Sequence, residues 1–231
     1  MKKIWIALVA GMLLLVISAC GDNKDDSKNK EAAQQSKSIE ISDAEKVEED
    51  KVVVHVNDQE IKGSHYNSIY VQTKMRLHQF GQDTSDKETL KNQTLDELVA
   101  QELIKQDAEA QGVNVSEEEV KTEFDTFKAE NKEQLAAYLK EYHLTEDTFK
   151  YQVKLNLILE KYVDETMQVK DVTEDEIKKT YDQLKEQNKE IPKLEEIKPT
   201  IKEQLVKQKQ QEQLQAKLEK LKKNATIEKL I

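Results

Sequence analysis

The side chains able to do chemistry are few in this sequence and widely spaced. No two of the four histidines (His55, His65, His78 and His143) are three or four residues apart, the spacing that places two metal ligands on one helix face. No glycine-rich phosphate loop, nucleophile elbow or zinc pattern occurs. Acidic pairs are common, but 35% of the residues are charged, so such pairs are expected on solvated surfaces. We therefore expect structural or surface roles for the histidines and predict no active site, metal or cofactor.

One acidic cluster needs a separate account. Glu117, Glu118 and Glu119 follow Ser116, which together with Glu119 forms a capping-box pattern at the start of a helix. Carboxylates in a first helical turn complement the helix dipole. A cation could bind such a cluster, but no further ligand group is spaced to complete its coordination shell. The dipole role is therefore the preferred interpretation.

Cys20 is the single cysteine, which excludes an internal disulfide. It follows a leader of 19 residues in which Lys2 and Lys3 precede the uncharged apolar run from Ile4 to Ile17. At about 1.5 Å per residue this run reaches roughly 21 Å, short of the ~30 Å hydrocarbon core of a membrane. The leader therefore has the features of a signal peptide rather than of a permanent membrane span.

The residues before Cys20 carry a first resemblance. Ile17-Ser18-Ala19-Cys20 resembles the bacterial lipobox in both sequence and position. The resemblance implies that residues 1–19 are removed, that Cys20 receives a diacylglycerol, and that the mature chain is tethered to the outer face of the cytoplasmic membrane. Two acyl chains anchor stably where one binds only marginally. The alternative is an ordinary secretory signal in which Cys20 is incidental.

Composition narrows the range of partners. The chain has 36 basic and 46 acidic residues, and since the leader holds two lysines and no acid, the mature part has a formal charge of −12. Arg76 is its only arginine, which argues against nucleic acid as a partner.

Residues 21–50 contain ten acids and five lysines without sustained apolar periodicity. We therefore predict that residues 20–50, lipidated cysteine included, form a disordered acidic tether.

The rest of the chain, residues 51–231, has the pattern of a mainly α fold. We predict an elongated multi-helix lobe with a long C-terminal helix and a small two-stranded β pair formed by the N- and C-terminal segments. The first strand is expected at 51–56, with Val52, Val54 and Val56 on one buried face, and the second at 225–231. Helices are expected from Gly63 or Ser64, after capping boxes that begin at Ser85, Ser116 and Thr173, and after Thr145. The last helix is expected at about 193–223, with a polar middle at 207–213 that bridges two packed ends.

Helical spacing also indicates the buried faces. The second long helix should bury Leu95, Leu98, Val99, Leu103 and Ala108. The helix after Thr145 is apolar on several faces and is expected at the centre of the bundle. Most aromatic residues should belong to the core, although five side chains are candidates to line a groove: Tyr66, Tyr70, Met75, Tyr138 and Tyr142.

A second resemblance covers nearly the whole mature chain. Residues 52–61 (VVVHVNDQEI) look like the opening strand and turn of SurA-type and PrsA-type chaperones, and 95–115 (LDELVAQELIKQDAEAQGVNV) resembles their signature helix. Residues 116–120 and 172–177 are similar to two further helix starts of the family. Residues 194–199 (LEEIKP), the long helix and 225–227 resemble its closing segment. PrsA-type foldases carry a parvulin-type prolyl isomerase domain between the last two helices, where this chain has only about ten residues, near 185–193.

The resemblance implies a chaperone frame without the isomerase. The expected function is a holdase, tethered on the extracytoplasmic face of a Gram-positive bacterial membrane, that binds unfolded or newly translocated polypeptides and uses no nucleotide, metal or catalysis. The alternative is an adaptor or assembly factor that docks on one specific membrane or envelope partner. An isomerase, suggested by family membership alone, is a third reading. The sequence leaves open whether the protein is a monomer or a homodimer.

Overall fold

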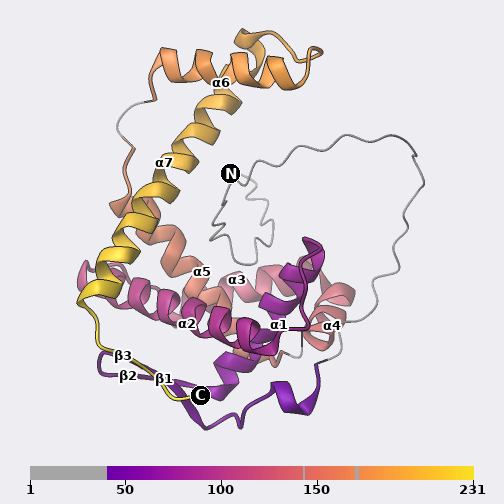
Figure 1. The fold of residues 1–231 in the computed structure, drawn as a ribbon, viewed down its shortest axis with the longest axis vertical. Coiled ribbons are helices and arrows are strands. Elements are labelled where there is room, and N and C mark those ends of the chain that lie inside the picture. The colour runs from indigo at the N-terminus through magenta and orange to yellow at the C-terminus, as the bar shows by residue number, and fades with distance from the viewer. Residues whose placement is uncertain (1–40, 143, 170–171) are drawn as a thin grey trace. The chain divides into compact units, whose positions relative to one another are not determined.

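The computed structural model describes residues 41–142, 144–169 and 172–231, apart from the side chain of Glu133. The predicted leader, Cys20 and tether residues 21–40 lie outside these ranges, as does His143. The described part is the unit Ile41–Ile231. Its seven helices run in chain order (Figure 1): α1 Gly63–Gln79, α2 Lys87–Ala110, α3 Glu117–Glu130, α4 Lys132–Glu141, α5 Glu146–Thr166, α6 Glu174–Gln187 and α7 Leu194–Asn224. The fold is mainly α, as predicted.

The strands form one antiparallel sheet of order β2-β1-β3, made of β1 Val52–Val56, β2 Gln59–Lys62 and β3 Ile227–Lys229. The predicted pairing of the two terminal segments is confirmed by the β1–β3 ladder. The sheet has one strand more than predicted, because the chain turns at Asn57, with φ 55°, and returns as β2. The expected alternation is also wrong at one point. A register shift between Val52 and Val54 lets both Val53 and Val54 be fully buried.

Most helix starts follow the predicted capping chemistry. Ser116 and Thr173 form reciprocal capping boxes with a glutamate three residues later, and Thr145 caps α5. The prediction for α2 is wrong by one residue, because its N-cap is Asp86 rather than Ser85. The Asp86 carboxylate accepts hydrogen bonds from the backbone N–H groups of the second and third helical residues, each at 3.1 Å. Two N–H groups on one carboxylate satisfy more of the helix start than a single hydroxyl would.

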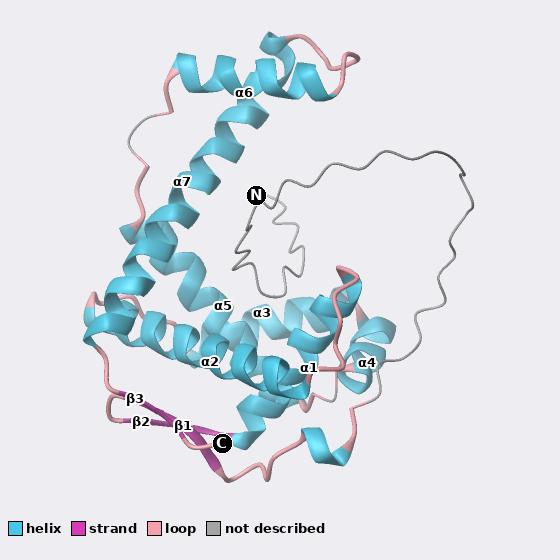
Figure 2. Cartoon of the chain, viewed as in Figure 1, coloured by secondary structure: helices cyan, strands magenta, loops and turns pink. Residues whose placement is uncertain are grey.

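The main core lies where α2 meets α1, α5 and the sheet, and the strands all lie on one side of α2 (Figure 2). Every residue of the predicted α2 stripe is buried. α5 contacts α1, α2 and α3, in line with the central position expected for it. Its apolar faces are only partly covered, however, since Phe149, Ile158 and Tyr162 are buried while Leu159 is 38% exposed. The helix therefore has more apolar surface than its neighbours cover.

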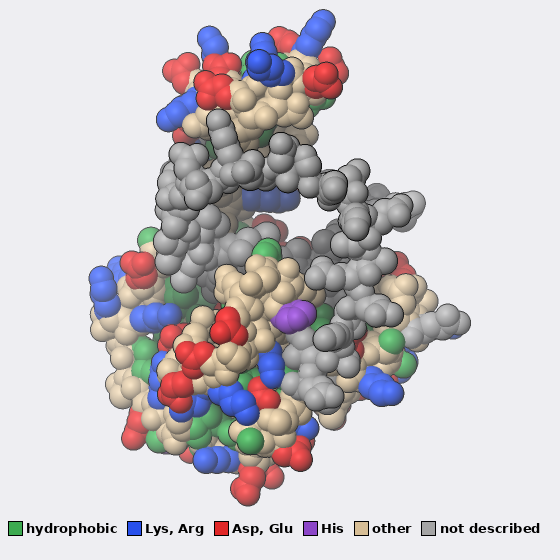
Figure 3. Space-filling view, turned by 45° about the vertical axis from the view of Figure 1, so that its right-hand side comes forward, with side chains coloured by type: hydrophobic (Ala, Val, Ile, Leu, Met, Phe, Trp, Pro, Cys, Tyr) green, Lys and Arg blue, Asp and Glu red, His purple; other side chains and the backbone are tan. Residues whose placement is uncertain are grey.

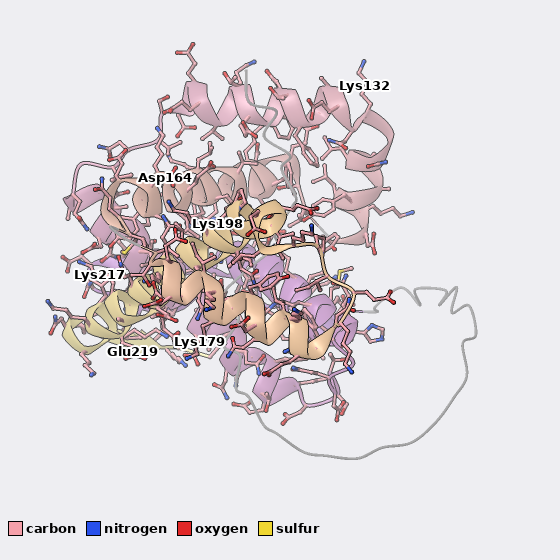
Figure 4. The ribbon with its side chains drawn as sticks, turned by 90° about the horizontal axis from the view of Figure 1, so that it is seen from above. Lys132, Asp164, Lys179, Lys198, Lys217 and Glu219 are labelled. Atoms are coloured by element: carbon pink, nitrogen blue, oxygen red, sulfur yellow. The ribbon has the colours of Figure 1, made fainter. Side chains whose placement is uncertain are left out.

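α7 packs on α6 with its first part and on α2 with its last part, as the polar middle predicted. Ile201 is buried in the first part, and Leu214 and Leu218 are buried in the last. Figure 4 shows Lys198 and Lys217 along α7. Lys198 pairs with Glu174 of α6 at 2.7 Å, whereas Lys217 pairs with Asp107 of α2 at 3.0 Å. α6 and α7 are joined by residues 188–193, a connection of only six residues.

The segment before β1 differs from the sequence-based expectation. Residues 42–51, most of which were assigned to the disordered tether, lie against α1 and include the short 3-10 turn η1, Asp43–Glu45. Glu45 is 8% exposed and forms an ion pair with Lys74. An acid-rich segment is expected to be disordered when its carboxylates have no partner in the folded part of the chain. Here Lys74 of α1 is the partner of Glu45, and the segment is ordered. No helix in the described ranges is long and apolar enough to cross a membrane.

Candidate functional site

The described histidines do not form a chemical centre. His55 lies on the sheet, 3.4 Å from Glu228 and 3.8 Å from Glu60, His65 stacks on Tyr151, and His78 is exposed on α1. Among residues 41–142, 144–169 and 172–231, no three histidine, cysteine or acidic side chains are grouped as metal ligands. The apolar and aromatic side chains that could contact a polypeptide are the next candidates.

Aromatic side chains gather where α3, α4 and α5 meet. The Phe149 ring lies in the middle, with ring centroids 6.0 Å from Phe124, 5.3 Å from Phe127 and 5.7 Å from Tyr138. Tyr142 stacks on Tyr138 at 4.2 Å. The inner members Phe124, Leu135, Leu144 and Phe149 are buried, whereas the outer ones are half-buried: Phe127, Tyr138, Leu139, Tyr142 and Val153. We call these nine residues the aromatic end.

Three helices, α3, α4 and α5, position the aromatic end. α4 has only ten residues and contacts chiefly α3, so its place depends on Leu135 packing inward from it. The ammonium groups of Lys128 and Lys150 lie 5.5 and 4.9 Å from the centroid of the Phe124 ring, where cation–π attraction holds them. The result is an apolar surface with lysines at its edge, supported on one side by a helix with few contacts.

The two tyrosines of the aromatic end keep their protons. Burial raises the pKa of Tyr138 to about 12, with smaller contributions from Tyr142 and Glu141. Burial likewise raises the pKa of Tyr142, and Glu141 adds to it. Both phenols are therefore neutral at physiological pH, and each offers an apolar ring with one hydroxyl group. This combination suits contact with polypeptides of varied sequence.

The five predicted groove residues fall into two groups. Tyr138 and Tyr142 belong to the aromatic end and are half-buried. Tyr66, Tyr70 and Met75 lie in the core, with exposed fractions of 3, 2 and 7%. Helical spacing places all five on apolar faces but cannot tell which face a neighbour covers. The structure therefore assigns Tyr66, Tyr70 and Met75 to packing.

A shallow cleft between α1, α2 and α5 was not foreseen from the sequence. Ile61, Ile69, Leu98 and Leu155 make its apolar lining, and His65 stacks on Tyr151 at 4.0 Å along it. Burial lowers the pKa of His65, and the charge of Lys105 acts in the same direction, so a neutral imidazole is favoured. Gln152 donates a hydrogen bond to Ser68 across the cleft. The one sequence signal was the polar pair His65 and Ser68, placed three residues apart beside Ile69.

The surroundings of these features are highly charged. On the face seen in Figure 3, acidic and basic side chains are interspersed, with small apolar areas between them. Phe80, at the end of α1, is 64% exposed and is not one of the nine residues of the aromatic end. A single exposed apolar residue is ordinary, whereas a group of adjoining, partly buried aromatic side chains is a candidate contact surface.

Comparison with known proteins supports the family resemblance. The profile of the SurA-like N-terminal domain matches residues 1–163. The foldase protein PrsA of Caldanaerobacter subterraneus subsp. tengcongensis is 30% identical over 146 residues, which cover 58% of this chain and 43% of that protein. The chaperone SurA of Pectobacterium atrosepticum is 27% identical over 113 residues, 48% of this chain and 26% of that protein. The chain spans less than half the length of these relatives. Since the profile matches well over half of the sequence, the chain belongs to the SurA-like N-terminal domain family, a chaperone-like family.

Proposed function

We propose that this protein is a membrane-tethered extracytoplasmic holdase, which binds unfolded or partly folded secreted polypeptides and has no prolyl isomerase activity. The observation that carries the proposal is the aromatic end, whose outer side chains are only partly buried and adjoin one another: Phe127, Tyr138, Leu139, Tyr142 and Val153. Family membership supports the same conclusion, because the two relatives are named as a foldase and a chaperone.

The arrangement of the aromatic end suits weak and reversible binding. Its inner phenylalanines are fixed by packing, so the outer rings present apolar surface with few rotamers left to lose on binding. α4 has few contacts and can adjust to clients of different shape. Release then needs no nucleotide, since the buried apolar area of each contact is small.

The lack of isomerase activity is proposed from the connection between α6 and α7. A prolyl isomerase must hold the X-Pro bond in a shaped pocket and lower a barrier of ~18–20 kcal/mol. Residues 188–193 are too few to form a domain with its own core. The short connection supports the proposal that the described helices act on clients by binding and not by catalysing isomerisation.

The experiment uses residues 21–231 and a denatured model client, without ATP. We expect the protein to suppress client aggregation and to leave the isomerisation rate of a proline-containing peptide at its uncatalysed value, with a parvulin enzyme as positive control. Replacing Tyr138 and Tyr142 by serine should reduce the suppression several-fold, while circular dichroism shows the helices retained. Phe80→Ser, which removes an exposed ring outside the aromatic end, is the matched control.

Each result bears on the proposal. Catalysed isomerisation would refute the non-enzymatic part. Equal loss of suppression in the Phe80 and tyrosine variants would show that the aromatic end is not the binding surface. Failure to protect any of several clients, together with tight binding of one native envelope protein, would favour the adaptor function instead.

Membrane attachment through Cys20 is part of the same proposal, and it is supported by the lipobox-like Ile17-Ser18-Ala19-Cys20. In cells supplied with a fatty-acid analogue that can be detected after incorporation, the parent protein should be labelled. Cys20→Ala should be unlabelled and either retain its leader or appear in the medium. Ser18→Thr, which keeps the cysteine, serves as the control. Equal labelling of the Cys20 variant and the parent would rule out this anchor.

A further inference from the structure

Residues 42–51, here called the strap, are held on α1 mostly through their backbone. The Asn67 side chain donates to the Val47 carbonyl at 2.8 Å and accepts from the Val47 N–H at 2.9 Å. The first two N–H groups of α1, from Gly63 and Ser64, donate to carbonyl groups of the strap at 2.7 and 3.0 Å. On the strap, these contacts are made by backbone groups, so they do not depend on a particular strap side chain.

One strap side chain occupies a built pocket. Glu45 is 8% exposed, and its Oε1 accepts from the Lys74 ammonium at 2.6 Å and from the Tyr70 hydroxyl at 3.0 Å. Burial alone would raise the pKa of Glu45, but hydrogen bonds from Lys74, Ser42 and Tyr70 outweigh it and lower the pKa to about 2. The pocket therefore selects a carboxylate. The Glu45 side chain covers the Tyr70 hydroxyl, so Tyr70 is not available to a client while the strap is docked.

The strap backbone also packs tightly against Gly63, the first residue of α1. A Cβ atom at Gly63 would lie 2.0 Å from the Glu48 carbonyl oxygen and 2.8 Å from a methyl group of Val47. Only a residue without a side chain lets the strap backbone approach so closely. The groove thus has three parts: the carboxylate pocket of Lys74 and Tyr70, the Asn67 amide and the Gly63 floor.

We propose that this groove on α1 is a peptide-binding site, occupied here by the chain's own strap. Its external ligand would be a polypeptide segment that can adopt the strap's turn-containing backbone, with an acidic side chain two residues before a β-branched one, the pattern of Glu45 and Val47. Glu45 is the only buried residue of the strap, so the strap is held on α1 by hydrogen bonds and one ion pair rather than by a buried apolar face. Because the strap is covalently attached, its effective concentration at the groove is in the mM range. A client that is already bound elsewhere on the same molecule reaches a similar effective concentration and can therefore compete with the strap. This inference rests on the proposed polypeptide-binding function and names a class of segment that it recognises.

The test reverses the charges in the pocket of residues 21–231. Glu45→Lys faces Lys74 with a like charge and should release the strap, whereas the double variant Glu45→Lys/Lys74→Glu pairs the two swapped charges and should dock it again. Asp43→Lys changes an exposed residue of the same strap and is the control. Amide exchange at 42–51 reports docking. Fluorescence anisotropy measures the binding of a labelled peptide that copies residues 41–51.

In the Glu45→Lys variant we expect fast amide exchange at 42–51 and binding of the peptide. In the parent, the Asp43 control and the double variant, exchange should be slow and peptide binding roughly tenfold weaker. A peptide with glutamine in place of its Glu45 should lose roughly tenfold in affinity, because a hydrogen bond to a charged group is lost. Slow exchange in the Glu45→Lys variant, or a released strap with no peptide binding, would overturn the proposal. Equal binding by the parent would overturn it too. Aggregation suppression is measured on the same samples, so the holdase function can survive any of these failures.

Discussion

At the scale of single residues, polar side chains of the described molecule join its helices through hydrogen bonds and ion pairs. Asp107 shows this: its carboxylate accepts from the Tyr162 hydroxyl at 2.5 Å and from Lys217 at 3.0 Å, and so connects α2 to α5 and α7. Burial opposes ionisation of Asp107, but these two partners lower its pKa. Gly63 joins two segments through the backbone instead, because the lack of a side chain lets the strap pack against the start of α1.

Gly63→Ala should destabilise the protein by about 1–3 kcal/mol, because the added methyl group collides with the Glu48 carbonyl and forces the strap away. Thermal unfolding gives the stability, and amide exchange should locate the change at 42–51. Ser64→Ala is the control, since it leaves this contact unaltered. Unchanged stability with a protected strap would show that α1 and the strap adjust without cost.

At the scale of elements, contacts divide the described helices into groups. α6 contacts chiefly α7, with Ile177 and Ile201 buried between them and Lys209 paired to Glu176 at 2.7 Å. The sheet is secured differently: β3 pairs with β1, the Leu230 N–H donates to the Val53 carbonyl, and Lys229 pairs with Asp96 of α2. We therefore expect α6 and the first part of α7 to unfold locally. Loss of β3, by contrast, should destabilise the main core.

Ile201→Ala should loosen α6 at a cost of about 2–4 kcal/mol, because it leaves a cavity in a small core. Amide exchange in α6 should accelerate while exchange in the centre of α2 stays slow. Lys202→Ala, on the exposed side of α7, should change neither. Equal acceleration in α2 would mean that α6 and the main core unfold as one unit.

Deleting residues 225–231 should lower the thermal stability of the whole α1–α2 core rather than merely shorten the chain. β1 would lose one of its two ladders, and the buried Val53, Val54 and Val56 would be exposed at a sheet edge. Glu228→Ser retains the strand and is the control. A deletion variant that unfolds at the same temperature as the parent would show that β3 contributes nothing to the core.

At the scale of the whole described molecule, acid should destabilise the fold through its capping carboxylates. Hydrogen bonds from Lys161 and Ser116 lower the pKa of Glu119 to about 2, and those from Lys209 and Thr173 do the same for Glu176. Because these values lie below the ordinary 4.5, the unfolded chain binds protons first as the pH falls. Stability is fully present above about pH 5 and decreases toward pH 2.

The measurement is the unfolding temperature between pH 6 and pH 2. Glu176→Gln should be less stable than the parent at pH 6, and the difference should shrink as the pH falls, because protonation of the parent removes the same interaction. Glu219→Gln removes an exposed carboxylate from α7 and serves as the control. A difference between Glu176→Gln and the parent that is independent of pH would exclude the proposed linkage.

The sequence by itself determined the features that depend on local chemistry. Capping boxes place the starts of α3 and α6, apolar periodicity identifies the buried stripe of α2, and the polar middle of α7 indicates its two packed ends. The pairing of β1 with β3 was likewise predictable, from two short apolar segments at the ends of a recognisable family pattern. Hydrogen bonding and helical geometry act over a few residues, so these features can be found in the sequence.

Tertiary structure decided which apolar faces are covered. Tyr70 and Tyr142 follow the same helical pattern, but Glu45 of the strap covers Tyr70, whereas nothing in the described part of the chain fully covers Tyr142. The strap itself escaped prediction because its acidic composition matches that of a solvated tether, and the partner of Glu45 lies 29 residues away, on α1. Burial is a property of the neighbours that folding brings together, and the sequence around a residue does not contain them.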